Sequence, residues 1–151
     1  MQRTMRGRAA LAAITAVLAH GGGACSDDDE DARGGSRPSE GASALTARLS
    51  EDVIELSSGT VAAGTVTITA ENVGTMEHEL LVVRSDAPLD GLDVVDERVP
   101  EDAIDMVDEI SEFEAGSTET KYFDLTAGRY LLICNLPGHY AAGMRAELIV
   151  T

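Results

Sequence analysis

Short runs of β-branched and aliphatic residues, separated by turn residues, recur along the chain from Leu45 onward. Residues 64–70 alternate apolar and polar side chains and end at the turn residues 72–74, which is typical of a strand with one buried face. Similar runs predict further strands at residues 53–56, 79–83, 120–125, 128–134 and 145–150. Strands at this spacing, without a repeated β-α-β unit, predict an all-β fold in the form of an antiparallel sandwich.

The segment between residues 85 and 114 follows this pattern less clearly. Residues 99–102 place a proline at a first helical position and acids in the first turn, which is typical of a helix start. Three apolar residues then recur at helical spacing: Ala103, Val107 and Ile110. We therefore expect a short helical excursion near residues 100–110, with a strand over residues 107–113 as the alternative. In either case one apolar stripe would pack an acidic surface segment onto the sandwich.

The first 24 residues have the layout of an export signal. A basic start with Arg3, Arg6 and Arg8 precedes the apolar run 9–19 and the small residues 21–24. The apolar run is far shorter than the roughly 20 residues that a transmembrane helix requires. Small residues directly before Cys25 resemble the processing site of bacterial lipoproteins, although the position three before the cysteine is Gly22 rather than a larger aliphatic residue.

We expect cleavage at this site, a lipid on Cys25 and an anchor on the outer face of the cytoplasmic membrane. Ordinary cleavage nearby, which would give a periplasmic or secreted protein, is the alternative. Residues 25–44 are rich in acids, Gly and Ser and have little apolar surface to bury. They predict a disordered tether that leads into a single folded domain, residues 45–151.

Charge narrows the classes of partner. The formal net charge is −16, and the predicted signal contributes only positive charges, so the mature protein would be more acidic still. Such a surface repels nucleic-acid phosphates and anionic lipid headgroups, and it favours a basic protein partner. Simple solubility is the alternative explanation. We expect a monomer that binds no nucleic acid.

The strongest chemical signal lies between the last two predicted strands. Cys134, His139 and Met144 place a thiol, an imidazole and a thioether at fixed spacing on one loop, which could wrap a single soft ion. His78, the other histidine outside the predicted signal, follows the turn residues 72–75 and could complete the set if the fold brings it close. Because Cys25 and Cys134 suit different roles, we expect no disulfide between them.

This pattern resembles the cupredoxins, or blue type 1 copper proteins. The resemblance rests on a histidine after an Asn-x-Gly turn and on Cys-x4-His-x4-Met before the last strand, a spacing similar to that of rusticyanin and sulfocyanin. It implies a Greek-key β-sandwich with one copper ion per chain. His78, Cys134 and His139 would be the equatorial ligands, and Met144 the axial ligand.

Two neighbouring residues are candidates for supporting the ligands. Glu79 stands where some cupredoxins place Asn, which puts a side-chain bridge there in question, but its backbone N–H could still reach the sulfur. Asn135 could tie the Cys134 loop to the His78 loop or could cap a turn.

A copper ion enclosed by four protein ligands favours one-electron transfer over catalysis, and the mature chain lacks the additional histidines of multicopper enzymes. We therefore expect an exported electron carrier and no enzyme activity. A copper chaperone or buffer protein is the alternative, and a metal-free sandwich used for adhesion is a second one. The partner would be a basic redox protein of cytochrome or oxidase type. It would dock on apolar residues around His139, namely Leu136, Pro137, Tyr140, Ala141 and Ala142.

Overall fold

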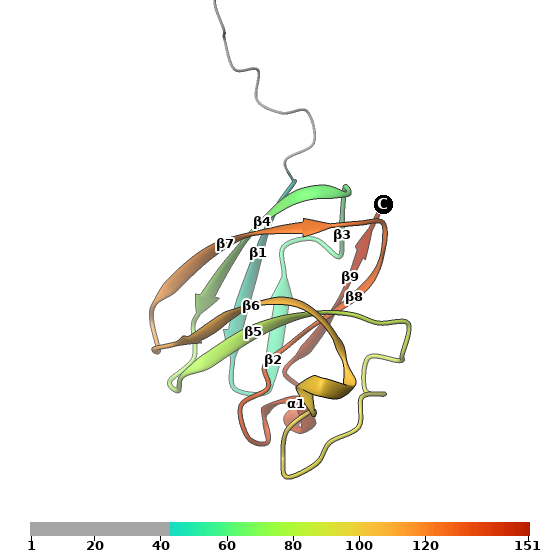
Figure 1. Cartoon of the computed structure of the whole chain (residues 1–151). Helices are drawn as coiled ribbons and strands as arrows, with labels where there is room; N and C mark the ends of the chain where they lie inside the picture. Colours follow the sequence, from blue (N-terminus) through green and yellow to red (C-terminus); the bar gives the residue numbers. More distant parts are fainter. Residues whose placement is uncertain (1–42) are drawn as a thin grey trace, which may run out of the picture. The chain divides into compact units, whose positions relative to one another are not determined.

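The computed structural model describes residues 43–151, which form two packed β-sheets (Figure 1). The first sheet has the order β2-β1-β4-β7, and the second has the order β3-β9-β8-β5-β6. The strands of the first sheet are β1 (Ser43–Ser50), β2 (Val53–Leu56), β4 (Gly64–Asn72) and β7 (Thr118–Leu125). Those of the second are β3 (Thr60–Val61), β5 (His78–Arg84), β6 (Asp105–Phe113), β8 (Gly128–Ile133) and β9 (Arg145–Val150). The predicted all-β sandwich is confirmed.

The predicted export signal, most of the tether and Cys25 lie outside the described residues. Ser43 and Ala44 already belong to β1, so the folded domain begins slightly before the predicted boundary at residue 45. Within the described part of the chain, no helix is long and apolar enough to cross a membrane.

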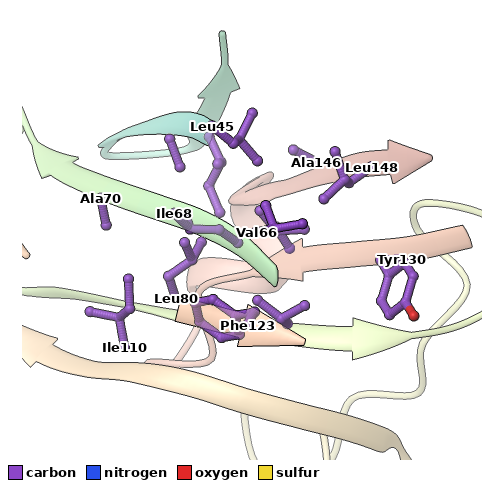
Figure 2. Close-up of a cluster of buried hydrophobic side chains, with 14 of the residues drawn as sticks. Leu45, Val66, Ile68, Ala70, Leu80, Ile110, Phe123, Tyr130, Ala146 and Leu148 are labelled. Carbon is purple, nitrogen blue, oxygen red and sulfur yellow. The ribbon is translucent and has the colours of Figure 1, made fainter. Parts of the chain in front are cut away.

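The core between the sheets comes from strands whose side chains alternate between the two faces. In β4, Val66, Ile68 and Ala70 are buried while the residues between them are partly exposed. They pack with Phe123 of β7 and with Leu80 of the second sheet (Figure 2). Removal of this apolar surface from water is the main term that holds the two sheets together.

The central strands of the second sheet, β5 and β8, are buried on both faces. Their outer face carries Leu81, Val83, Leu131 and Ile133, which form a second apolar cluster with Val99 and Tyr140. Residues 85–104, here named the excursion, cover this face through Val99 and the partly buried side chains of Leu92 and Ile104. The prediction of a surface segment held by apolar side chains is therefore confirmed, but with different residues in contact.

The predicted short helix near residues 100–110 is present only as one 3₁₀ turn, η1 (Glu101–Ala103), and the alternative of a strand over residues 107–113 is confirmed within β6. The chain becomes extended at Ile104 and continues as β6, which pairs along β5. Ala103 and Val107 are exposed, so the helical spacing of the apolar residues does not describe one buried face. Backbone pairing with the free edge of β5 decides the conformation here, since local spacing is a weaker signal than sheet formation.

Strand pairing also differs from the purely antiparallel expectation. The pairs β1·β4 and β3·β9 are parallel, while the other pairs are antiparallel. After β2 the chain crosses to the edge of the second sheet as β3 and then returns as β4, so β1 and β4 run in the same direction. Neither β1 nor β3 was predicted. Both sheets are therefore mixed.

Candidate metal centre

Antiparallel pairing of β5 with β8 brings the predicted ligands together at one end of the second sheet. Leu81 pairs with Ile133, so the start of β5 lies beside the end of β8. His78 is the first residue of β5, and Cys134 directly follows β8. The connection from β8 to β9, residues 134–144, is named the ligand loop, and its short helix α1 (His139–Ala142) begins with His139.

Three of the predicted ligand atoms converge there. The Nδ1 atoms of His78 and His139 lie 3.3 Å apart, and the Cys134 sulfur lies 3.3 Å from the His139 Nδ1. All three atoms lie within 4.8 Å of one another. His78 and Cys134 are fully buried, whereas His139 is partly exposed. His139 is therefore the ligand through which the centre reaches the surface.

The geometry fits a metal ion in the middle of the three atoms. Ligand atoms about 2.0–2.3 Å from a shared ion in a trigonal plane lie roughly 3.5–4 Å apart, close to the separations seen here. Burial, together with the nearby His139, lowers the pKa of His78, which keeps the imidazole neutral and its lone pair free for coordination. Two imidazoles with one thiol are the donor set that copper takes in trigonal sites.

The Cys134 sulfur is surrounded by apolar residues and by backbone donors. Burial raises the pKa of the thiol, and the backbone N–H groups of Glu79 and Leu136 act in the opposite direction. These N–H groups would stabilise the thiolate that forms when the sulfur coordinates a cation. The role of the Glu79 N–H at the sulfur stays a prediction, which the direction of this effect supports.

The side chain of Glu79 is also buried, at 5% exposure. Burial raises the pKa of its carboxyl group to about 7, with further increases from Glu112 and Glu109, while Arg98 and the backbone N–H of Asn135 lower it. The Oε1 atom of this carboxyl group is buried and has no hydrogen-bond partner among the described residues.

Asn135 has a different partner from the one expected. Its side-chain oxygen accepts a hydrogen bond from the Val99 N–H at 2.7 Å, and its nitrogen donates to the Val99 carbonyl at 3.0 Å. The Arg98 guanidinium donates to the Asn135 carbonyl at 2.9 Å. Asn135 thus ties the ligand loop to the excursion rather than to the turn before His78.

Backbone hydrogen bonds close the ligand loop on itself. The Met144 N–H donates to the His139 carbonyl at 3.0 Å, and the Cys134 N–H donates to the Met144 carbonyl at 3.1 Å. Gly138, at φ 83°, supplies the left-handed residue that precedes α1. Met144 is fully buried in the same apolar cluster as Cys134. Its spacing and burial agree with the predicted axial position, which stays a prediction.

Sequence reasoning missed the residues that hold the turn before His78, here named the His78 turn (residues 73–77). The buried side chain of Asn72 donates to the Met76 carbonyl at 2.8 Å and to the Phe113 carbonyl at 3.2 Å, and it accepts from the Gly74 N–H at 3.1 Å. The only sequence signal was the Asn-x-Gly pattern, which marked a turn and not these partners.

A β-sandwich with two imidazoles and a buried thiol gathered at one end defines a mononuclear copper protein of the cupredoxin class. The family of copper binding proteins described as the plastocyanin/azurin family matches residues 53–151. The chain belongs to this family. The cluster of His78, Cys134 and His139 is consistent with a single type 1 copper site.

Solved structures agree with this assignment. Dithionite-reduced auracyanin from the photosynthetic bacterium Roseiflexus castenholzii is 25% identical, covers 74% of this chain and 99% of its own length, and superimposes with a TM-score of 0.56. Auracyanin B (24% identity, 74% and 90% coverage, TM-score 0.54) has the same fold. So does rusticyanin from Thiobacillus ferrooxidans (19% identity, 72% and 76% coverage, TM-score 0.50). No curated protein matches the chain.

Proposed function

We propose that this protein is an exported blue-copper protein that carries single electrons between redox partners. The observation that carries the proposal is the convergence of the His78, His139 and Cys134 donor atoms within 4.8 Å of one another at the end of a rigid sandwich. Met144 is the proposed axial ligand. Copper bound there would alternate between Cu(II) and Cu(I), and so would accept and release one electron.

The protein's part is to hold the ligands still and to keep water out. His78 and Cys134 have no exposed surface, and they lie at the ends of paired strands of the core. A ligand set that does not rearrange between two oxidation states favours fast electron transfer, because little reorganisation accompanies each step. A closed set also leaves no open position for a substrate, so we propose a carrier and not an enzyme.

The direct test adds one equivalent of Cu(II) to the purified metal-free protein. We expect one copper per chain and the intense visible band of a thiolate-to-copper transition, because Cys134 is a ligand. Cys134→Ser should abolish this band while the fold survives. Cys25→Ser is the matched control and should retain the band in full. A colourless stoichiometric Cu(II) complex of the unchanged protein would contradict the proposal.

Repeated redox cycling separates a carrier from a copper chaperone or buffer. A carrier keeps its ion through many cycles of reduction and oxidation in the presence of a chelator. Burial of His78 and Cys134 supports retention, because the ion could leave only past the partly exposed side of His139. Loss of copper to the chelator within a few cycles would favour the chaperone.

The role of Met144 has its own test, because a weak axial ligand tunes the potential more than it creates the site. Met144→Gln should keep a coloured centre and lower the reduction potential measured by voltammetry. Met106→Gln, at a partly buried position in the other apolar cluster, is the control and should leave the potential near its original value. An unchanged or higher potential in Met144→Gln would argue against axial ligation.

We further propose that a basic redox protein docks around His139. Pro137, Ala141 and Ala142 are exposed beside it, whereas Leu136 is partly buried and Tyr140 is buried, so the apolar surface is smaller than the sequence suggested. Acids elsewhere on the surface would steer a basic partner, and salt would screen this attraction.

Electron exchange with a basic redox protein should therefore slow as ionic strength rises. Ala142→Glu should slow transfer without changing the visible spectrum. Ala127→Glu makes the same change of charge at an exposed site directly before β8, at the end of this strand that lies away from Cys134. It should have little effect on the rate of electron transfer. Equal rates for the two variants would place the docking surface elsewhere.

Export and lipid attachment at Cys25 complete the proposal, and they rest on the sequence. A lipoprotein should fractionate with membranes and yield an N-terminal lipopeptide in mass spectrometry. Cys25→Ser should release the protein. Membrane association that persists in Cys25→Ser would argue against the lipid.

A further inference from the structure

The turn between β1 and β2 contacts both halves of the copper site. Its first residue, Glu51, receives three hydrogen bonds on one carboxylate oxygen from the His78 turn: the Thr75 N–H at 2.5 Å, the Thr75 hydroxyl at 2.9 Å and the Met76 N–H at 3.1 Å. These donors, chiefly the Thr75 N–H, lower the pKa of Glu51 to about 2. The carboxylate therefore stays ionised.

The same carboxylate lies near the outer nitrogen of His78. A Cβ added to Gly74 would be 2.8 Å from the Glu51 Oε1 and 3.0 Å from the His78 Nε2, so both atoms lie beside the same glycine. The His78 Nε2 is buried and has no hydrogen-bond partner among the described residues. Burial and His139 lower the pKa of His78, and the negative charge of Glu51 acts in the opposite direction.

The second residue of the turn packs against the ligand loop. A Cβ added to Gly143, at φ 132°, would be 2.6 Å from the Asp52 carbonyl oxygen, so only glycine allows this approach directly before Met144. Asp52 itself has a left-handed backbone, at φ 76°. The β1–β2 turn is thus fitted between the His78 turn on one side and the residue before Met144 on the other.

The negative charge of Glu51 can affect how His78 binds copper. The His78 Nδ1 faces the other donor atoms, so an imidazole that offers its lone pair there carries its proton on Nε2. A carboxylate near this N–H increases the electron density on the ligand nitrogen, in the way that carboxylates behind metal-bound histidines do. It also stabilises the more positive oxidation state of the centre.

We propose that Glu51 is a positioning residue, which fixes the His78 turn and sets a negative charge behind the His78 Nε2–H so that Cu(II) is favoured over Cu(I). This inference rests on the proposed function. It assigns the reduction potential partly to a residue at the end of the first strand, remote in sequence from all four proposed ligands.

The test compares three variants of the copper-loaded protein. Glu51→Gln keeps an oxygen acceptor for the His78 turn and removes the charge, so the ratio of Cu(II) to Cu(I) affinity should fall on the order of tenfold, a rise of about 59 mV in potential for a one-electron couple. Glu55→Gln makes the same change at an exposed site on β2. Thr75→Val deletes one hydrogen bond to Glu51 but keeps the charge. Both controls should stay near the original potential.

The metal-free protein gives an independent reading by ¹⁵N NMR of the His78 side chain. Glu51 should hold the proton on Nε2, and Glu51→Gln should shift the tautomer population toward the Nδ1–H form. If Glu51→Gln does not fold, Gly74→Ala provides the second variant. Its methyl group would press on both the Glu51 carboxylate and the His78 ring and so increase their separation, and the potential should rise as it does in Glu51→Gln.

Equal potentials in Glu51→Gln and Glu55→Gln, or an unchanged His78 tautomer, would overturn the inference and leave the proposed function intact. An unchanged protein that binds no copper with the intense band would instead overturn the proposed function. The NMR comparison would then still decide whether Glu51 controls the His78 proton.

Discussion

The ligand loop and the His78 turn place the proposed copper ligands at the same point by different means. The loop carries Cys134, His139 and Met144 in one connection, and its own backbone closes it through bonds such as Met144 N–H to the His139 carbonyl. The turn carries no ligand of its own, and side chains from elsewhere hold it: Asn72 at the end of β4 and Glu51 after β1. One half of the site is therefore encoded locally, while the other depends on long-range packing.

The largest expected effect comes from the core beneath His78. Leu80→Ala removes a fully buried side chain two positions after the ligand and should lower the free energy of unfolding by about 2–5 kcal/mol. Leu148→Ala makes the same truncation in β9, where the strand pairs with Tyr130. Urea unfolding of the metal-free proteins should show similar losses, and only Leu80→Ala should also weaken copper binding. Equal copper affinities would mean that His78 does not depend on its strand's packing.

The two buried asparagines allow a finer comparison. Asn72→Ala and Asn135→Ala each leave buried backbone groups without partners and should cost about 1–3 kcal/mol of unfolding free energy. Asn72→Ala should speed the loss of copper, because the His78 turn loosens. Asn135→Ala should instead increase hydrogen exchange at Val99, because the excursion loosens. If both variants changed copper release and exchange alike, the two regions would form a single unit.

The effect that is smallest per pH unit concerns Glu79, which directly follows His78. Its pKa of about 7 in the folded protein exceeds the usual value of about 4.3, so the unfolded chain releases this proton at lower pH. Stability contributed by the protonated group is full below about pH 4.3 and is lost as pH rises toward 7, by at most about 1.4 kcal/mol per pH unit. Glu79→Gln in the metal-free protein should flatten this decline in denaturant titrations at several pH values. A parallel decline in both proteins would locate the pH dependence elsewhere.

The difference between the ligand loop and the His78 turn also explains which parts of the site could be predicted from the sequence. The loop ligands could be predicted because three donor types stand at fixed spacing within one connection, and His78 followed from the turn before it and from the scarcity of histidines. The partners of Asn135 and Glu51 could not be predicted, because their hydrogen bonds join segments tens of residues apart. The spacing of residues within one segment does not predict contacts with a distant segment.

Two errors in the fold have the same cause. Ala103, Val107 and Ile110 recur at helical spacing, yet Ala103 ends a 3₁₀ turn and the other two belong to β6, because β5 offers an edge with which this segment pairs. The parallel partner of β1 likewise depends on where the chain returns after β3. Local composition identified most strands, whereas the neighbours of each strand are set by the path of the chain through both sheets.

The direction of β1 determines at which end of the domain the preceding chain is attached. Its first residue, Ser43, pairs with Val66 near the start of β4, and Leu49 near its end pairs with Asn72, next to the His78 turn. The chain thus enters the domain at the pole opposite the copper ligands. Under the proposed function, an anchor would be joined to the domain at this pole and a redox partner would dock at the other, so attachment and electron transfer would use different ends of the domain.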